Sequence, residues 1–521
     1  MAEHYDVIVI GSGAGGGTLT YQLAHTGKRI LLLERGGFMP REIENWSSKA
    51  VWGDLRYRNS GEWTDQDGNK FIPKQHYCVG GNTKVYGAIL FRMRERDFGE
   101  VTHVDGVSPA WPLDYDDMEP YYTRAEHLYS VHGERGLDPL DPPSSSPYPY
   151  PAVSDEPRIA QLRSDLAAMG LHPFTLPVGI LLDESRPSTS PCIRCATCDG
   201  YPCLANAKAD AHVVCVEPAI RMPNVTLMTN AYVSKLKTNA SGTAVSRVVV
   251  ERDGQKQELS ADVVVVSCGA INSAALLLRS ASAKHPEGLG NGSGMVGRNL
   301  MLHNNSALIA FSKTPNPTRF EKTLGINDFY YETPDWDYPL GAMQMLGKSD
   351  AWGLSFDAAE GEDPEELARH SLDFWLTTED LPRPENRVFA KRGGGIRLSY
   401  TPNNVEAHQR LVAKFKSLLD GMGCREDVWD RHRYLGGTLG IEGVAHQNGT
   451  VRFGDDPSEA PLDIDCKLHE VDNVYVVDAS FFPSSSAVNP TLTIIANAIR
   501  VGDHISERLG ASMSEVVGAG V

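Results

Sequence analysis

Two residues near the carboxyl end of the chain have side chains that can act on an alcohol hydroxyl, one by accepting its proton and the other by orienting it. His446 stands in the segment IEGVAHQNGTVRFG, and Asn489 directly precedes Pro490. An imidazole with a pKa near neutrality can accept a hydroxyl proton, and a carboxamide can orient the same hydroxyl. Each residue also has a structural explanation. A lone histidine often serves packing, and Asn489 before a proline is typical of a helix N-cap, with Pro490 as the first helical residue.

The stretch 5–36, YDVIVIGSGAGGGTLTYQLAHTGKRILLLERG, predicts a strand, a glycine-rich turn, a helix and a second strand. Gly11, Gly13 and Gly16 supply the G-x-G-x-x-G spacing, which permits a tight turn, the close approach of a pyrophosphate and helix-on-strand packing. The N–H groups at the start of that helix favour a diphosphate. Glu34, 18 residues after Gly16, can accept hydrogen bonds from an adenosine ribose. The unit predicts a dinucleotide site without deciding between NAD and FAD.

Other segments show which elements must position these residues. Small residues at high density in 71–94, around GGNT at 80–83, suggest a backbone pressed against a flat ligand. Residues 261–279 predict an apolar strand, a small-residue turn and an apolar helix, a second such unit against the same nucleotide. The Pro- and Ser-rich stretch 139–151 predicts an exposed loop that marks a boundary or a lid. From 303 to 439, β-prone stretches alternate with polar loops, with a helix expected at 408–419.

The composition limits the class of protein. The chain has 521 residues, 41% of them hydrophobic and 22% charged, as in a soluble globular protein of more than one domain. Its net charge of −18 argues against a nucleic-acid partner. There is no secretory signal pattern at the N-terminus and no apolar run of membrane-spanning length, so we expect a cytoplasmic protein without a membrane partner.

Four of the nine cysteines crowd into one segment, CIRCATCDGYPC, at positions 192, 195, 198 and 203. Thiols so spaced are compatible with structural thiols or a disulfide, an iron–sulfur cluster, or zinc. The spacing lacks the final element of the ferredoxin-like run, and no second C-x2-C pair stands at zinc-ribbon distance. Structural thiols or a disulfide are therefore favoured, and no metal site is assigned.

Several motifs together resemble the glucose-methanol-choline flavoprotein oxidoreductases, and the resemblance covers nearly the whole chain. The resembling segments are the opening fingerprint, GGNT…G at 80–87, Trp111-Pro112, Tyr121-Tyr122, Ala125-Glu126, Asn206-Ala207-Lys208, Gly297-Arg298-Asn299, Asn386-Arg387-Val388, H-x-x-G-T at 446–450, D-A-S at 478–480 and N-P-T at 489–491. The resemblance implies an α/β fold with a Rossmann-like FAD-binding domain and a second, α+β substrate domain built on an antiparallel sheet. We expect the FAD-binding domain at 1–302, with a loop or lid insertion at 139–190. The substrate domain is expected at 303–439, and the chain returns to the FAD domain at 440–521.

The resemblance also implies roles for individual residues. The active-site pair of the superfamily falls on His446 and Asn489, with His446 as the base while the substrate hydride moves to flavin N5. A helix beginning at Pro490 would stabilise negative charge on the reduced ring. The expected FAD contacts are Gly11, Gly13, Ala14, Gly15, Gly16, Glu34, Arg35, Gly81, Asn82, Thr83, Val233, Gly269, Ala270, Asp478, Ala479, Pro490 and Thr491. Val85 stands where pyranose 2-oxidases attach the flavin to a histidine, so FAD is expected to be non-covalent.

Among relatives of this kind, the GGNTKVYG, CIRCATCDGYPC and His/Asn combination is most similar to bacterial oxidases that act at C3 of glycosides, including C-glycosides, and give 3-keto sugars. The expected partners are a sugar or glycoside and oxygen or another electron acceptor. The alternatives are a pyranose 2-oxidase, a dehydrogenase passing electrons to a quinone or a cluster, or a flavin-binding protein without turnover. The substrate, the acceptor and the oligomeric state are not fixed by the sequence.

Overall fold

The computed structural model describes residues 3–58, 61–390, 394–430, 440–441, 443 and 445–511, with only the backbone described at 428–430. The predicted domain boundary at residue 439 lies outside these residues. Within the described chain, no helix is both long and apolar enough to cross a membrane.

Seven strands of the described chain form the first sheet, in the order β11-β2-β1-β14-β13-β12, with β22 also pairing with β14. The strands are β1 (His4–Ile10), β2 (Ile30–Leu33), β11 (Val225–Met228), β12 (Tyr232–Thr238), β13 (Val245–Arg252), β14 (Gln255–Val266) and β22 (Val474–Val476). β11, β2, β1, β14 and β22 run parallel, whereas β13 and β12 are antiparallel additions. The apolar runs VIVI in β1, ILLL in β2 and VVVV at the end of β14 suit strands buried on both faces.

Three helices begin at the carboxyl edge of this parallel sheet or close to it. α1 (Ala14–Ala24) follows β1, α5 (Ala270–Arg279) follows β14, and α10 (Thr491–Arg508) comes after β22. Parallel strands present their carboxyl ends at one edge, so chain segments separated by more than 450 residues meet there.

Six strands within the described residues form the second sheet, in the order β21-β15-β18-β17-β16-β9, and all its pairings are antiparallel. The strands are β9 (Phe174–Thr175), β15 (Asn304–Ser312), β16 (Leu324–Ile326), β17 (Ala342–Met345), β18 (Ser371–Thr378) and β21 (Cys424–Asp430). Helix α8 (Val405–Leu418) packs on this sheet through Ala407, Leu411, Phe415 and Leu418, which belong to a hydrophobic core separate from that of the first sheet.

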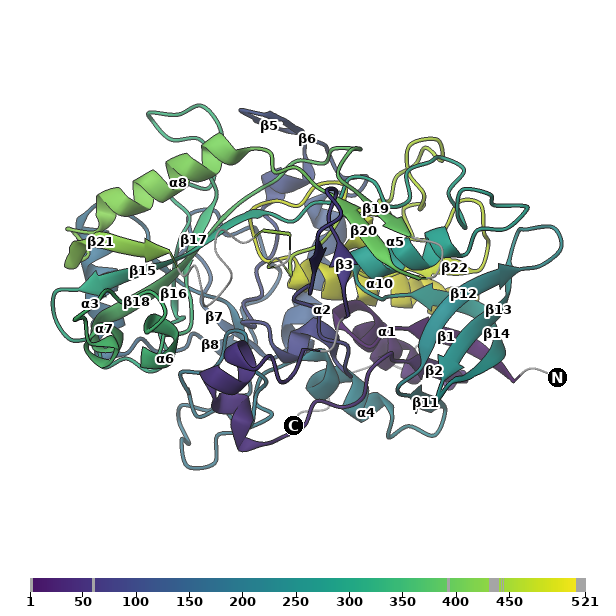
Figure 1. Ribbon diagram of the computed structural model, residues 1–521, viewed down its shortest axis with the longest axis horizontal. Coiled ribbons are helices and arrows are strands. Elements are labelled where there is room, and N and C mark those ends of the chain that lie inside the picture. The colour runs from purple at the N-terminus through teal and green to yellow at the C-terminus, as the bar shows by residue number, and fades with distance from the viewer. Residues whose placement is uncertain are drawn as a thin grey trace.

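The two sheets lie at opposite ends of the long axis of the molecule, with α1, α2 (Tyr115–Leu128) and α10 between them (Figure 1). The predicted α/β unit with an added antiparallel sheet is therefore confirmed.

The remaining helices are α3 (Pro157–Ala168), α4 (Glu217–Ala219), α6 (Ala351–Leu354) and α7 (Pro364–His370). The remaining strands are β3 (Trp63–Thr64), β4 (Lys70–Phe71), β5 (Val101–His103), β6 (Gly106–Ser108), β7 (Val131–Gly133), β8 (Tyr150–Pro151), β10 (Val178–Gly179), β19 (Arg387–Ala390) and β20 (Ile396–Ser399). Short helical turns occupy Ile43–Trp46, Lys49–Gly53, Gly81–Lys84, Glu95–Phe98, His212–Val216 and Ala479–Phe481.

Candidate functional site

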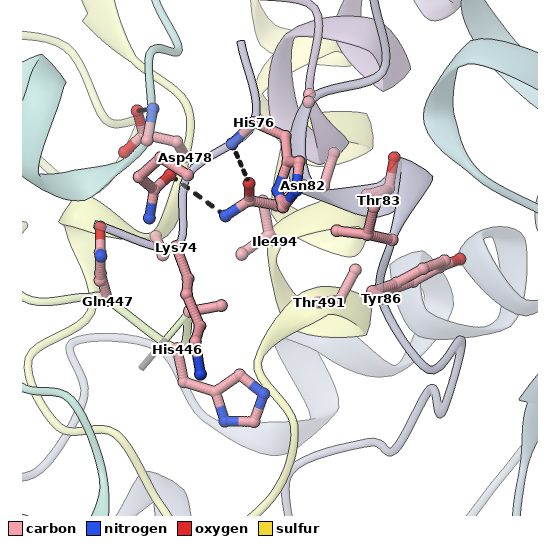
Figure 2. Close-up of a pocket in the computed structure, with 18 of the residues that line it drawn as sticks. Lys74, His76, Asn82, Thr83, Tyr86, His446, Gln447, Asp478, Thr491 and Ile494 are labelled. Carbon is pink, nitrogen blue, oxygen red and sulfur yellow. Dashed lines mark hydrogen bonds between the residues drawn. The ribbon is translucent and has the colours of Figure 1, made fainter. Parts of the chain in front are cut away.

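A cavity of about 390 Å³ extends from the carboxyl edge of the first sheet to the second sheet. Residues from distant parts of the chain surround it, among them Asn82, His446 and Thr491 (Figure 2). The sequence-predicted residues gather here: all of the expected FAD contacts except Gly16 line the cavity, together with His446 and Asn489.

The glycine-rich turn after β1 forms one end of this cavity. A Cβ atom on Gly15 would lie 1.8 Å from the Val477 carbonyl oxygen, and one on Gly16 would lie 2.0 Å from the Gly11 oxygen. Those two glycines are needed for packing, which explains why Gly16 does not face the cavity. A Cβ on Gly13 would meet no atom within 4 Å, so at this position the backbone is open to a ligand.

Within the described chain, no side chain caps the starts of α1, α5 or α10. Residues at all three starts line the cavity: Ala14 in α1, Ala270 in α5 and Thr491 in α10. Uncapped N–H groups and the helix dipole favour negative charge. Three such starts around one cavity, with the open backbone at Gly13, fit an anionic dinucleotide.

Glu34, which the sequence assigns to a ribose, is buried at the end of β2. Its Oε2 atom accepts hydrogen bonds from the Ser12 backbone N–H at 3.1 Å and from the Ser12 hydroxyl at 2.6 Å, and its Oε1 atom accepts one from the Gly36 N–H at 2.9 Å. Burial raises the pKa of Glu34, while these hydrogen bonds act to lower it. The carboxyl therefore ties the glycine-rich turn to β2 as well as facing the cavity.

The turn Gly81–Lys84 forms another wall. Asn82 accepts a hydrogen bond from the His76 N–H at 2.9 Å and donates one to the Gln75 side chain at 3.1 Å (Figure 2). Beneath the turn, the Lys84 ammonium lies 2.9 Å from the Asp210 carboxylate, and both side chains are buried. Val85 lines the cavity next to this turn and carries no atom that can bond to a ligand covalently.

Asp478 joins the end of β22 to the start of α5. Its Oδ2 atom accepts hydrogen bonds from the Gly269 N–H at 2.9 Å and from the Ser273 hydroxyl, and its Oδ1 atom accepts one from the Ser480 N–H. Asp478 stabilises the turn that presents Gly269 and Ala270 to the cavity.

The start of α10 differs from the sequence prediction at Asn489. The residue preceding the helix is Pro490, with φ −77° and ψ −9°, and the Asn489 side chain does not cap it. The predicted capping hydrogen bond of Asn489 is therefore absent, and the helix begins at Thr491, one residue after the predicted start at Pro490. No described residue forms a hydrogen bond with the Asn489 amide, which lines the cavity and is open to a ligand there.

His446 is half-buried in the cavity wall. Its Nδ1 atom lies 3.1 Å from Nδ1 of His303, and the two rings are nearly perpendicular. Burial, and then the neighbouring His303, lower the pKa of His446 to about 3. The imidazole is therefore neutral at physiological pH, the state in which it can accept a proton.

The second sheet contributes two residues that the sequence did not single out. Gln344 of β17 and Trp375 of β18 are direct cross-strand partners, and both line the cavity. The Gln344 Oε1 and Trp375 Nε1 atoms are buried and have no hydrogen-bond partner among the described residues. The Trp375 ring lies 6.3 Å from that of His446. Both side chains therefore stand in the cavity wall beside the candidate base, with these two polar atoms enclosed by protein.

The four clustered cysteines lie beside the cavity, since Ala196, Asp199, Gly200 and Tyr201 of the same segment line it. All four are free thiols in the structure. Burial raises the pKa of Cys192 to about 12 and also raises that of Cys198. Among the described residues, no group of three or more His, Cys, Asp or Glu side chains is arranged to hold a metal ion.

The chain is similar to known proteins over almost its whole length. Family models described as GMC oxidoreductase match residues 5–305 and 396–498. The chain is 32% identical to 6'''-hydroxyparomomycin C oxidase of Streptomyces lividus, covering 97% of this chain and 92% of that protein. It is 29% identical to paromamine 6'-oxidase of Streptomyces fradiae, covering 95% and 90%. The fold resembles a formate oxidase from Aspergillus oryzae, in a structure concerned with FAD modification, with a TM-score of 0.68 and 16% identity over 97% of this chain and 98% of that one.

Proposed function

The chain belongs to the GMC oxidoreductase family, whose members bind FAD and act on CH–OH groups, and on this premise we propose that it oxidises a secondary alcohol on a sugar ring. The proposed product is a keto sugar, formed at C3 of a glycoside or C-glycoside, with oxygen as the electron acceptor. The observation that supports this most is a neutral, half-buried His446 in the same cavity as the open Asn489 amide and the dinucleotide cradle.

FAD, when bound, supplies the acceptor for the carbon-bound hydrogen and the electron pair that the alcohol loses. The residues of the chain do the rest. His446 takes the hydroxyl proton as the C–H and O–H bonds break and the carbonyl forms. Asn489 orients the hydroxyl oxygen by hydrogen bonding. The N–H groups at the start of α10 favour negative charge at that end of the cavity.

Two observations support a sugar as the substrate. The aligned relatives are named as oxidases of 6'''-hydroxyparomomycin C and of paromamine. Gln344 and Trp375 also line the cavity beside His446, and an amide and an indole N–H are groups that bind the hydroxyls of a polyol.

We further propose that the FAD-binding part comprises 1–302 and 440–521, with the insertion at 139–190, and that 303–439 forms the substrate part. The membership of the strands supports this division, since β1, β2, β11–β14 and β22 build the first sheet and β15–β18 and β21 belong to the second. The exceptions are β9, which joins the second sheet from the first segment, and the pair β19 and β20, which forms a sheet with β3 and β4 of the first segment.

Anaerobic mixing with a panel of sugars and glycosides tests the proposed function. At least one member is expected to bleach the flavin absorbance, and the product is expected to carry a ketone at C3 of the ring. Product analysis by NMR distinguishes C3 from C2, the position expected of a pyranose 2-oxidase. Bleaching by simple alcohols with none by any sugar would contradict the proposal.

The cofactor is expected to be non-covalent, because the cradle provides contacts for phosphate and ribose and Val85 offers no attachment atom. Acid precipitation is expected to release all of the yellow colour into the supernatant. Flavin that stays with the precipitated protein would contradict this prediction, and peptide mass analysis would then locate the attached residue.

A further inference from the structure

His303 is a buried histidine just before β15, only 2% exposed, and it contacts the candidate base directly. Its Nε2 atom lies 3.2 Å from the Ser485 carbonyl oxygen, and its Nδ1 atom lies 3.1 Å from Nδ1 of His446. It does not line the cavity, and none of the sequence motifs includes it. It therefore acts on the reaction only through His446.

The two hydrogen bonds determine where the protons lie. A carbonyl oxygen only accepts, so Nε2 of His303 must carry a hydrogen. Burial lowers the pKa of His303 despite the nearby Asp380 and Glu379 carboxylates, so the ring is neutral and its Nδ1 atom bears a lone pair. That lone pair accepts the hydrogen of His446 Nδ1. Nε2 of His446 is then left without a proton.

The Nε2 atom of His446 forms no hydrogen bond with any described residue. The atom is also not enclosed by protein, so a ligand can reach it. Since His446 lines the cavity, this unprotonated nitrogen is the one available to a bound hydroxyl.

Two adjacent acidic residues hold His303 in place. Asp380 accepts hydrogen bonds from the His303 and Leu302 N–H groups, each at 2.8 Å, which stabilises the left-handed backbone of His303 at φ 66°. Glu379 accepts from the Ser485 and Ser486 N–H groups at 3.1 and 2.9 Å and so positions the carbonyl that His303 contacts. The His303 backbone and the Ser485 carbonyl that its ring contacts are therefore both anchored.

The charged and titratable groups around this arrangement are few. Besides His446, His303 faces Asp380 and Glu379. The Tyr400 hydroxyl donates to Asp380 at 2.8 Å, and Nε2 of His103 lies 3.2 Å from Glu379. Burial raises the pKa of Asp380. Neither carboxylate hydrogen-bonds to the His303 ring, so its two ring nitrogens are left to His446 and Ser485.

We propose that His303 is a positioning residue that fixes the tautomer and orientation of His446, so that the Nε2 atom of His446 is the proton acceptor. Which nitrogen of an imidazole carries the proton is set by the hydrogen bond that the other nitrogen makes. Without His303, the His446 ring is free to rotate and to carry its proton on either nitrogen. The role of His446 as base rests on the proposed function, whereas the tautomer assigned to His446 rests only on its contact with His303.

Two substitutions separate this role from a purely structural one. His303→Leu removes the acceptor. His303→Asn keeps an acceptor, since its Oδ1 atom takes the place of Nδ1, and asparagine tolerates the left-handed backbone. We expect His303→Leu to slow flavin reduction by roughly 10- to 100-fold, and His303→Asn to restore most of the lost rate. Equal flavin content and equal melting temperatures in the two variants serve as the folding control.

A direct readout of the tautomer keeps the inference testable even if no sugar reduces the flavin. Nitrogen-15 NMR of histidine-labelled protein, with His446 assigned by its loss in His446→Gln, is expected to show an unprotonated Nε2 and a protonated Nδ1. In His303→Leu that pattern should be lost. A protonated Nε2 in the native protein, or flavin reduction at an unchanged rate in His303→Leu, would overturn the proposal.

Discussion

At the scale of single residues, the environment of His446 makes a prediction about pH. Burial and His303 lower its pKa to about 3 from an ordinary value near 6.5. The reaction requires the unprotonated imidazole, which in this site persists as the pH falls well below 6.5. Flavin reduction by a non-ionising sugar is therefore expected to change less than about twofold between pH 5 and 7.5. Stopped-flow measurements across that range would show it, and an acid limb with an apparent pKa near 6.5 would contradict it.

Most residues that the sequence assigns to the cofactor lie together in the wall of the cavity, because local chain geometry determines their positions. Gly11, Gly13, Glu34 and Asp478 all stand where a parallel strand ends, so the pattern of strands places them at one edge. His303, Gln344 and Trp375 could not be found in the same way. Their importance depends on contacts across more than 70 residues of sequence, such as His303 with His446 and Trp375 with His446.

At the scale of elements, the buried pair Lys84–Asp210 is expected to stabilise the cavity-facing turn Gly81–Lys84. Both side chains are at most 4% exposed, and Asp210 also accepts a hydrogen bond from the Val213 N–H at 3.0 Å. Asp210→Ala leaves an ammonium group buried without its partner, at a cost of about 3–5 kcal/mol. Compared with the native protein, we expect Asp210→Ala to unfold at a lower urea midpoint and to retain FAD less tightly.

The matched control for Asp210→Ala is Asp420→Ala, which removes the carboxylate of an exposed pair with Lys313 at a similar distance of 2.7 Å. Solvent already screens that pair, so the urea midpoint and the FAD content should hardly change. If the two variants were equally stable, the buried pair would not be what holds the turn.

The element boundaries show what the pattern of residues predicts and what it misses. The predicted strand, turn, helix and second strand within 5–36 agree with β1, α1 and β2, and the predicted strand, turn and helix within 261–279 agree with the end of β14 and with α5. Helix α8 was predicted at 408–419 but spans Val405–Leu418, since its first turn is polar and begins after Asn404 in the left-handed region. At Asn489 the sequence pattern predicts a side-chain cap, but the orientation of that side chain depends on tertiary packing, and no capping hydrogen bond forms.

At the scale of the whole molecule, the four clustered cysteines bear on the electron acceptor. A metal cluster beside the cavity would let electrons leave one at a time, whereas without one the reduced flavin must react with oxygen or a soluble acceptor. We expect protein purified without oxygen to contain FAD but no stoichiometric iron or acid-labile sulfide. Stoichiometric iron with broad absorbance beyond the flavin bands would contradict the oxidase and favour a dehydrogenase.

The arrangement of the two sheets explains why the fold could be predicted while the substrate could not. The glycine spacing and the apolar runs of the sequence predict the first sheet and the helices that start at its edge, so the α/β class follows from the sequence. The wall opposite is made by Gln344 and Trp375 on paired strands, and neither residue type nor spacing marks them in the chain. Substrate choice therefore has to be measured.

The central claim is that His446 accepts the proton of the alcohol in the FAD-containing cavity, and one measurement tests it most directly. His446→Ala is compared with native protein and with His172→Ala, a control histidine whose side chain is 62% exposed. With FAD content equal in all three, anaerobic stopped-flow is used to follow flavin reduction by the best sugar of the panel. The account predicts a rate about 10²- to 10⁴-fold lower in His446→Ala and unchanged in His172→Ala. Bleaching of the flavin in His446→Ala at the native rate would contradict it.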